Sequence, residues 1–220
     1  MSRYNSRSQR IIKRFLPNSM KEDYQKRIDE STIRKWEKQG RPLPPPHIAK
    51  VRTIAKKQAE SGYRTLVESG TFMGDMIDAQ MKNFDKIYSI ELSDELFQKA
   101  VEKYRGNEKV HLLNGDSGKV LRDLIPNLKE PAIFWLDGHY SGGITAKGEK
   151  ICPVYAELDA ILKSDLAHMI LIDDARLFVG EDDYPTIEEL KSYLNKSDRN
   201  HSFEKEDDTI ILKRIDESAA

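Results

Sequence analysis

The fold is decided at residues 65–76, which read Thr-Leu-Val-Glu-Ser-Gly-Thr-Phe-Met-Gly-Asp-Met. An apolar run ends there in an acid and is followed by a turn with two glycines, which predicts a strand, a tight turn and a helix start. Glycines let the backbone approach a ligand, and the free amides of a helix start attract an anionic group. The spacing Glu-x-Gly-x-x-x-Gly differs from the Gly-x-Gly-x-x-Gly that holds a dinucleotide pyrophosphate. The turn therefore predicts a nucleotide site whose ligand is not NAD.

Apolar runs alternate with helical segments through most of the chain. We expect strands at residues 64–68, 86–91, 109–114, 132–137 and 169–173, with helices that begin near Gly74, Asp94, Ser117 and Pro153. A helix at 186–194 and a hairpin-like pair at 202–205 and 209–213 close the series. Short, almost wholly apolar strands in this order are typical of a parallel sheet covered by helices on both faces. The predicted fold class is α/β, with a doubly wound, mostly parallel sheet.

The first 46 residues look like an extension of this domain. They carry short helical patterns without one long apolar stripe, and the proline-rich run at 42–46 blocks a helix. A helix is expected next, over 47–61. We therefore divide the chain into a basic, partly helical extension at 1–46, a domain at 47–215 and a tail at 216–220.

The charges are distributed unevenly along the chain. Residues 1–50 hold 13 Lys and Arg against 5 Asp and Glu, so this arm carries about +8 and the remainder about −9. A basic arm can attract nucleic acid, anionic lipid or a phosphorylated substrate, and it can also dock on the acidic body of its own or a neighbouring subunit. These interpretations stay open, and so does a homo-oligomer.

The composition predicts a soluble, cytoplasmic protein. Hydrophobic residues make up 38% of the chain, and no apolar run approaches the roughly 20 residues of a transmembrane helix. The first residues lack the apolar region of a secretory signal, and the single cysteine, Cys152, excludes an internal disulfide.

An acidic residue comes at or just after the end of each of the five expected strands. In an open doubly wound sheet a ligand lies beyond the carboxyl ends of the strands, so these acids line the expected site. They are Glu68, Glu91, Asp116, Asp137 and the pair Asp173 and Asp174. Glu91 can accept both hydroxyls of a ribose, and Asp116 can accept from an adenine amino group or, like Ser117, cap the next helix. Any one of these acids could instead be a helix cap or a solvated loop residue.

Over residues 64–213 the chain resembles the class I S-adenosylmethionine-dependent methyltransferases. The resemblance rests on Glu68-x-Gly70-x-x-x-Gly74, on Glu91, on Gly115-Asp116 and on the closing hairpin. Phe72 stands where many members have a third glycine, a departure that the metal-dependent O-methyltransferases often share. The resemblance implies S-adenosylmethionine as the cofactor, with Glu68 and Gly70 at its methionine end, and an antiparallel seventh strand. The predicted cofactor-binding residues are Glu68, Gly70, Thr71, Gly74, Glu91, Asp116, Ser117 and Asp137.

Three of the acids, Asp137, Asp173 and Asp174, follow the fourth and fifth strands. Neighbouring strands lie about 5 Å apart, so these carboxylates are expected to converge on a volume suited to a hard divalent cation such as Mg²⁺. The trio resembles the metal ligands of catechol O-methyltransferase and, in its paired Asp-Asp, those of the macrocin-type sugar O-methyltransferases. Such a metal lowers the pKa of a hydroxyl acceptor while a nearby base removes the proton. The predicted catalytic residues are Asp137 and His139, with His139 as the base.

The glycine-containing segment 139–153 follows the fourth strand. A loop of this length at the edge of the site is expected to be a lid or a substrate-recognition element, with a surface loop that makes no contacts as the alternative. Tyr140 and Lys147 are the predicted substrate-binding residues, through hydroxyls or an anionic group.

Together these features predict a methyltransferase that acts on oxygen, with the help of Mg²⁺, in a hydroxylated small molecule such as a sugar or glycoside. A nucleic-acid methyltransferase that uses the basic arm is the second hypothesis. Nucleic acid is disfavoured as a partner because Asp137-Gly138-His139-Tyr140 lacks the Asn/Asp-Pro-Pro-aromatic sequence with which amino-methylating enzymes hold a flipped base. A noncatalytic module that binds the cofactor is the third.

Overall fold

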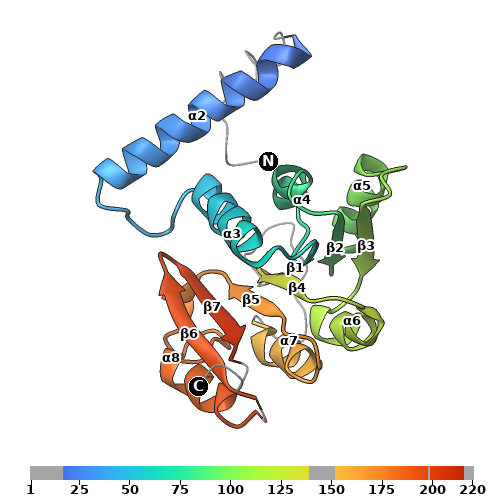
Figure 1. The fold of residues 1–220 in the computed structure, drawn as a ribbon, viewed down its shortest axis with the longest axis vertical. Helices are drawn as coiled ribbons and strands as arrows, with labels where there is room; N and C mark the ends of the chain where they lie inside the picture. Colours follow the sequence, from blue (N-terminus) through green and yellow to red (C-terminus); the bar gives the residue numbers. More distant parts are fainter. Residues whose placement is uncertain (1–16, 139–151, 198, 216–220) are drawn as a thin grey trace.

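The computed structural model describes residues 17–138, 152–197 and 199–215. Within them, seven strands form one sheet in the order β3-β2-β1-β4-β5-β7-β6 (Figure 1). Neighbouring strands from β3 to β5 are parallel, and β7 runs antiparallel to both β5 and β6. The predicted sheet with its antiparallel C-terminal strand is thereby confirmed. The strands are β1 (Thr65–Ser69), β2 (Lys86–Glu91), β3 (Val110–Asn114), β4 (Ala132–Leu136), β5 (Met169–Ile172), β6 (His201–Glu206) and β7 (Thr209–Arg214).

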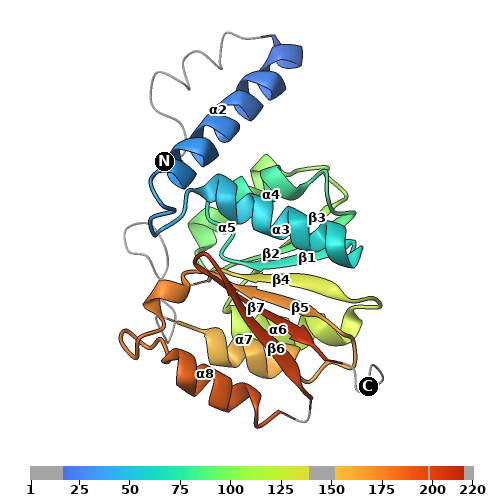
Figure 2. The ribbon, with the colours of Figure 1, turned by 60° about the vertical axis from the view of Figure 1, so that its left-hand side comes forward.

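Helices cover both faces of the sheet (Figure 2). One face carries α3 (His47–Ser61), α4 (Asp75–Gln80) and α5 (Asp94–Lys103). The other carries α6 (Ser117–Leu124), α7 (Val154–Ile161) and α8 (Ile187–Leu194). Two short 3₁₀ turns, η1 (Ile125–Asn127) and η2 (Ala175–Leu177), complete the connections. No helix among the described residues has the length and apolar composition needed to cross a bilayer.

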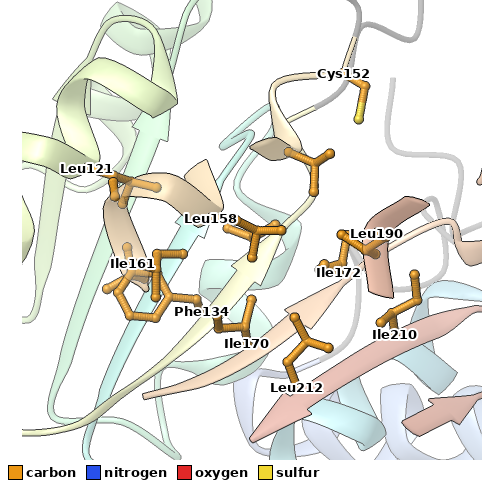
Figure 3. Packing of buried hydrophobic residues seen from close by; sticks show 14 of the residues in the cluster. Leu121, Phe134, Cys152, Leu158, Ile161, Ile170, Ile172, Leu190, Ile210 and Leu212 are labelled. Carbon is orange, nitrogen blue, oxygen red and sulfur yellow. The ribbon is translucent and has the colours of Figure 1, made fainter. Parts of the chain in front are cut away.

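Adjacent residues of the central strands supply two separate cores. Leu66 of β1 and Ile133 of β4 belong to the core under α3, α4 and α5, whereas Val67 and Phe134 belong to the core under α6, α7 and α8. Figure 3 shows the second core, which Phe134 of β4 shares with Leu158 of α7. Successive side chains of a strand point to opposite faces, so a strand that is covered on both faces can be apolar along its whole length, as β4 is.

One continuous helix, α2 (Asn18–Lys38), precedes the domain, where the sequence indicated only short helical patterns. Its anchor is at the C-terminal end, where Ile33 and Trp36 pack against Ala49 of α3 and the Trp36 indole donates to the Pro42 carbonyl at 2.8 Å. Most of the helix extends away from the sheet (Figure 1). Because so little of α2 is covered, it needs no long apolar stripe, and for that reason the sequence pattern understated its length.

His168 fixes the edge where β4 and β5 begin. Its ring is buried, its Nδ1 accepts from the Ala132 amide at 3.0 Å, and its Nε2 lies 2.9 Å from the Ser164 hydroxyl. Burial lowers the pKa of His168 to about 4. The folded state therefore holds this imidazole neutral, as an acceptor, at pH values where the unfolded chain already protonates it.

Lowering the pH is accordingly expected to destabilise the fold through His168. The folded pKa lies below the ordinary value of 6.5, so the contribution is complete above pH 6.5 and declines as the pH falls toward 4, by about 3 kcal/mol in total. The His168→Asn variant keeps an acceptor for the Ala132 amide but does not titrate. Urea unfolding at pH 7 and pH 4 should show the wild type losing about 3 kcal/mol more than the variant; parallel losses would contradict the role.

Candidate functional site

The carboxyl ends of β1 and β4 meet at the centre of the sheet, where the strand order reverses. Strands on one side of this point connect toward β3 and those on the other side toward β5. The loops diverge there, and in an open α/β sheet this is where a ligand is expected to bind. The Asp137 amide donates to the Ser69 carbonyl at 3.2 Å, which joins the two strand ends directly. Four of the predicted acids lie at this edge of the sheet. Glu68 and Glu91 belong to β1 and β2 on one side, and Asp137 and Asp173 follow β4 and β5 on the other.

The glycine turn after β1 is held tightly against its neighbours. Gly70 has a φ of +89°, and a Cβ on it would lie 2.5 Å from the backbone carbonyl oxygen of Asp137. Gly74 has a φ of +74° at the N-terminus of α4, where a Cβ would collide with the hydroxyl of Tyr104. Both positions require glycine, because L side chains rarely adopt this conformation and no space exists for one.

Glu91, at the end of β2, holds the glycine turn in place through hydrogen bonds to backbone amides. Its Oε2 accepts from the Phe72 amide at 2.8 Å and its Oε1 accepts from the Ser93 amide at 2.9 Å. Phe72 itself has a φ of +49° and is 38% exposed. It stands at the position where many class I methyltransferases have a third glycine. The predicted ribose acceptor therefore also fixes the shape of the turn, a role that its position in the sequence did not indicate.

Glu68 lies beneath the turn in a buried, acidic environment. Its Oε1 accepts from the Ser89 hydroxyl at 2.6 Å, and the Ser89 hydroxyl in turn lies 2.5 Å from the Thr71 hydroxyl. Burial raises the pKa of Glu68 to about 8; the Ser89 hydrogen bond opposes this rise, and the charges of Asp137 and Glu91 add to it. Such a site favours a ligand that brings a positive charge.

Asp116 caps α6. Its Oδ1 accepts from the Lys119 amide at 3.1 Å, so the capping alternative for Asp116 is realised, and the adenine role stays a prediction. Ser117 is the first residue of that helix and is buried.

Glu157 of α7 is a buried carboxyl near the turn that sequence analysis missed. Burial raises the pKa of Glu157. A Cβ on Gly138 would lie 3.3 Å from its Oε1, which places Glu157 directly under the backbone that follows β4.

The predicted metal ligands converge. Asp137, Asp173 and Asp174 each offer a carboxylate oxygen within 4.8 Å of the others, with Asp173 and Asp174 buried. The Asp173 amide donates to the Leu136 carbonyl at 3.0 Å, and Asp174 adopts a φ of +55°. Asp173 Oδ1 is buried and has no hydrogen-bond partner among the described residues. An orphaned carboxylate oxygen in a cluster of three carboxylates is what a bound cation would satisfy.

Two cations reach this trio, and sequence analysis missed both. Lys50 of α3 donates from Nζ to Asp173 Oδ2 and, at 3.3 Å, to Asp174 Oδ1. Arg176 donates from NH1 to Asp174 Oδ1 at 2.6 Å and also to Asp208 Oδ2. Lys50 lies 123 positions from Asp173 in the chain, so no local spacing could have linked them.

The charges of the site leave room for a divalent ion. Arg176 is balanced by Asp208, and Lys50 offsets one of the three negative charges of the trio, so a formal charge of two negatives remains. Burial and the charge of Asp137 raise the pKa of Asp173 well above its ordinary value, while Lys50 opposes the rise. Oxygen ligands and this residual charge both fit a hard divalent cation.

A histidine that the sequence analysis had not singled out lies on the same helix face. His47 comes one turn before Lys50 on α3. Burial lowers the pKa of His47; the charges of Asp75 and Asp137 oppose this change, and the charge of Lys50 adds to it. The predicted base His139 and the predicted substrate residues Tyr140 and Lys147 lie outside the described residues.

Comparisons with known proteins bear on this architecture. No family model matches the chain, and no curated protein is similar to it in sequence. The Podospora anserina methyltransferase PaMTH1, solved with SAH, matches with a TM-score of 0.57 and 14% identity over 92% of this chain and 99% of its own. The Streptomyces achromogenes O-methyltransferase TomG, solved with SAM, matches with a TM-score of 0.55 and 15% identity over 85% of this chain and 88% of its own.

The chain has the methyltransferase fold. An O-methyltransferase from Bacillus cereus, solved with SAH, agrees with a TM-score of 0.53 and 15% identity over 86% of this chain and 90% of its own. In this methyltransferase fold, the glycine turn follows β1, and the acid trio follows β4 and β5.

Proposed function

We propose that this protein is an S-adenosylmethionine-dependent methyltransferase that methylates a hydroxyl group of a small molecule, with a divalent cation as cofactor. The observation that carries the proposal is the Asp137, Asp173 and Asp174 cluster beside the glycine turn, with its orphaned Asp173 oxygen. Gly70 lies against the Asp137 carbonyl, so the cofactor side and the acceptor side of the proposed site adjoin at this point.

The residues on the turn side suit the cofactor. We assign the methionine end to Glu68, Gly70, Thr71 and Gly74, the ribose to Glu91 and the adenine to Asp116 and Ser117, with Asp137 at the boundary between the two sides. S-adenosylmethionine would supply a methyl group on a positively charged sulfur. The buried carboxyl of Glu68, with acidic neighbours and a raised pKa, supports a cationic ligand at this position.

The residues on the trio side suit a hydroxylated acceptor. Asp137, Asp173 and Asp174 would hold Mg²⁺, which when bound lowers the pKa of a coordinated hydroxyl. His139 remains our proposed base, and His47, one turn before Lys50 on α3, is a second candidate among the described residues. A sugar or glycoside with vicinal hydroxyls is the acceptor class that best fits a trio of carboxylates, because two neighbouring oxygens can chelate one ion.

The nucleic-acid hypothesis finds no support in the described part of the arm. Arg41 pairs with Asp207 at 2.7 Å and Lys50 pairs with the trio, so basic residues near the domain dock on the acidic body.

The third hypothesis, a noncatalytic module that binds the cofactor, is distinguished by turnover. Such a module would bind the cofactor but would not methylate any hydroxylated acceptor.

Asp173→Asn is expected to abolish most turnover without loss of the cofactor. The Asp173 side chain is a predicted metal ligand but not a predicted cofactor contact, so turnover of a hydroxylated acceptor should fall about 100-fold or more, while the calorimetric affinity for S-adenosylmethionine stays within about threefold. Asp165→Asn, whose side chain is almost fully exposed, is the control. Full activity in Asp173→Asn would exclude the metal role, and absence of cofactor binding by the wild type would exclude the whole class.

A further inference from the structure

We infer that Lys50 is the resident cation of the acid trio, and that a divalent ion competes with its ammonium group for Asp173 and Asp174. The inference rests on the proposed function, since it assumes that the trio binds a metal ion. It adds a residue from the helix that precedes the sheet and lies outside the stretch that resembles methyltransferases in sequence.

The position of Lys50 is that of a counter-ion inside the site. Its side chain is only 15% exposed, and its Nζ contacts one oxygen of Asp173 and one of Asp174. A buried carboxylate pair of this kind requires a positive charge, because unpaired buried charges are strongly unfavourable.

The ammonium group occupies oxygens that a metal ion would need. Asp174 Oδ1 accepts from both Lys50 and Arg176, and Asp173 Oδ2 accepts from Lys50, which leaves Asp173 Oδ1 as the orphaned oxygen of that residue. A divalent ion binds at about 2.0 to 2.6 Å from several oxygens at once. Its charge repels the ammonium group at this short range, so the two cations compete for Asp173 and Asp174.

Lysine can leave such a position without disturbing the helix that carries it. Its ammonium is a compact charge on a flexible four-carbon stem, whereas Arg176 is fixed by Asp208 through two donors. Lys50 is thus the exchangeable cation and Arg176 the permanent one. The apo site is stabilised by Lys50, and the loaded site releases this ammonium toward the crevice.

The test compares Lys50→Met with the wild type in the absence of cofactor and acceptor. Methionine keeps an unbranched apolar stem and removes the charge. Lys56→Met is the matched control, because Lys56 lies on the same helix and pairs at 3.0 Å with Glu206, with its side chain largely exposed. Thermal unfolding is followed against increasing Mg²⁺ or Mn²⁺, and Mn²⁺ affinity is measured by calorimetry.

Lys50→Met is expected to unfold at a lower temperature without metal, to recover on addition of Mn²⁺ or Mg²⁺, and to bind Mn²⁺ at least about tenfold more tightly than the wild type. Lys56→Met should behave as the wild type does. If Lys50→Met is unfolded without metal, refolding on addition of Mn²⁺ reports the same rescue. Lys50→Arg, which retains the charge, should show no gain in affinity.

Two failures can be told apart. If wild type and Lys50→Met bind Mn²⁺ with equal affinity and show the same thermal response, Lys50 does not compete and the inference is wrong, while the proposed metal site stands. If neither protein binds Mn²⁺ or Mg²⁺, the metal part of the proposed function is wrong. Rescue that persists when Asp173→Asn is added to Lys50→Met would also overturn the inference, because the ion would then bind elsewhere.

Discussion

Gly70→Ala is expected to destabilise the fold by about 3 kcal/mol or more and to weaken cofactor binding at least about 100-fold. The left-handed backbone, with φ of +89°, is strained for alanine, and the new Cβ would lie 2.5 Å from the Asp137 carbonyl oxygen. This neighbour is backbone and cannot rotate away, so β1 and β4 must separate at their carboxyl ends. Such a separation displaces both the glycine turn and Asp137, the first member of the acid trio.

Gly62→Ala is the matched control for this experiment. Gly62 ends α3 with φ of +71°, and a Cβ there would meet no atom within 4 Å. The substitution therefore carries the backbone strain alone, about 1 kcal/mol. Urea unfolding and calorimetry with S-adenosylmethionine measure both variants. Equal losses of stability, with cofactor binding intact in Gly70→Ala, would refute the close approach as the reason for glycine at position 70.

Asp208→Asn is expected to cost about 3 kcal/mol of stability and to weaken Mn²⁺ binding at the trio. Asp208 lies in the turn between β6 and β7, is 0% exposed, and accepts from both the backbone amide and the guanidinium of Arg176. An amide in its place presents a donor to the guanidinium, so Arg176 turns its charge to Asp174, where it competes with the metal ion. A purely structural role would lower stability and leave the ion affinity of the folded protein unchanged.

The adjacent Asp207 provides the control within the same turn. Asp207 pairs with Arg41, whose side chain is 51% exposed, and does not reach the trio. Asp207→Asn should cost at most about 1 kcal/mol, because a pair with an exposed partner contributes little, and should leave Mn²⁺ affinity unchanged. If the two variants behaved alike, Asp208 would have no special role in positioning Arg176.

The strands, and the residues at which the helices begin, could be predicted to within about one residue. For the central strands the reason is that both faces of the sheet are covered. A strand buried on both faces is apolar throughout and ends where polar residues begin, as at Leu136 and Ile172. Helix α2 was understated for the opposite reason, since most of its surface is not covered. Asp116 shows a third case, in which the same residue type suits a ligand and a helix cap, and local sequence cannot choose between them.

The sequence by itself determined the sheet, the glycine turn and the row of acids at the strand ends, because each depends on local periodicity and on the fixed geometry of parallel strands. Only the tertiary structure decided which groups share those acids. Lys50 reaches the trio from a preceding helix, 124 positions from Asp174, and Asp208 holds Arg176 from a hairpin turn 32 positions farther along the chain. Ion pairs between such distant residues leave no period in the chain, and the packing of α3 and of the β6 and β7 turn against the strand ends creates them.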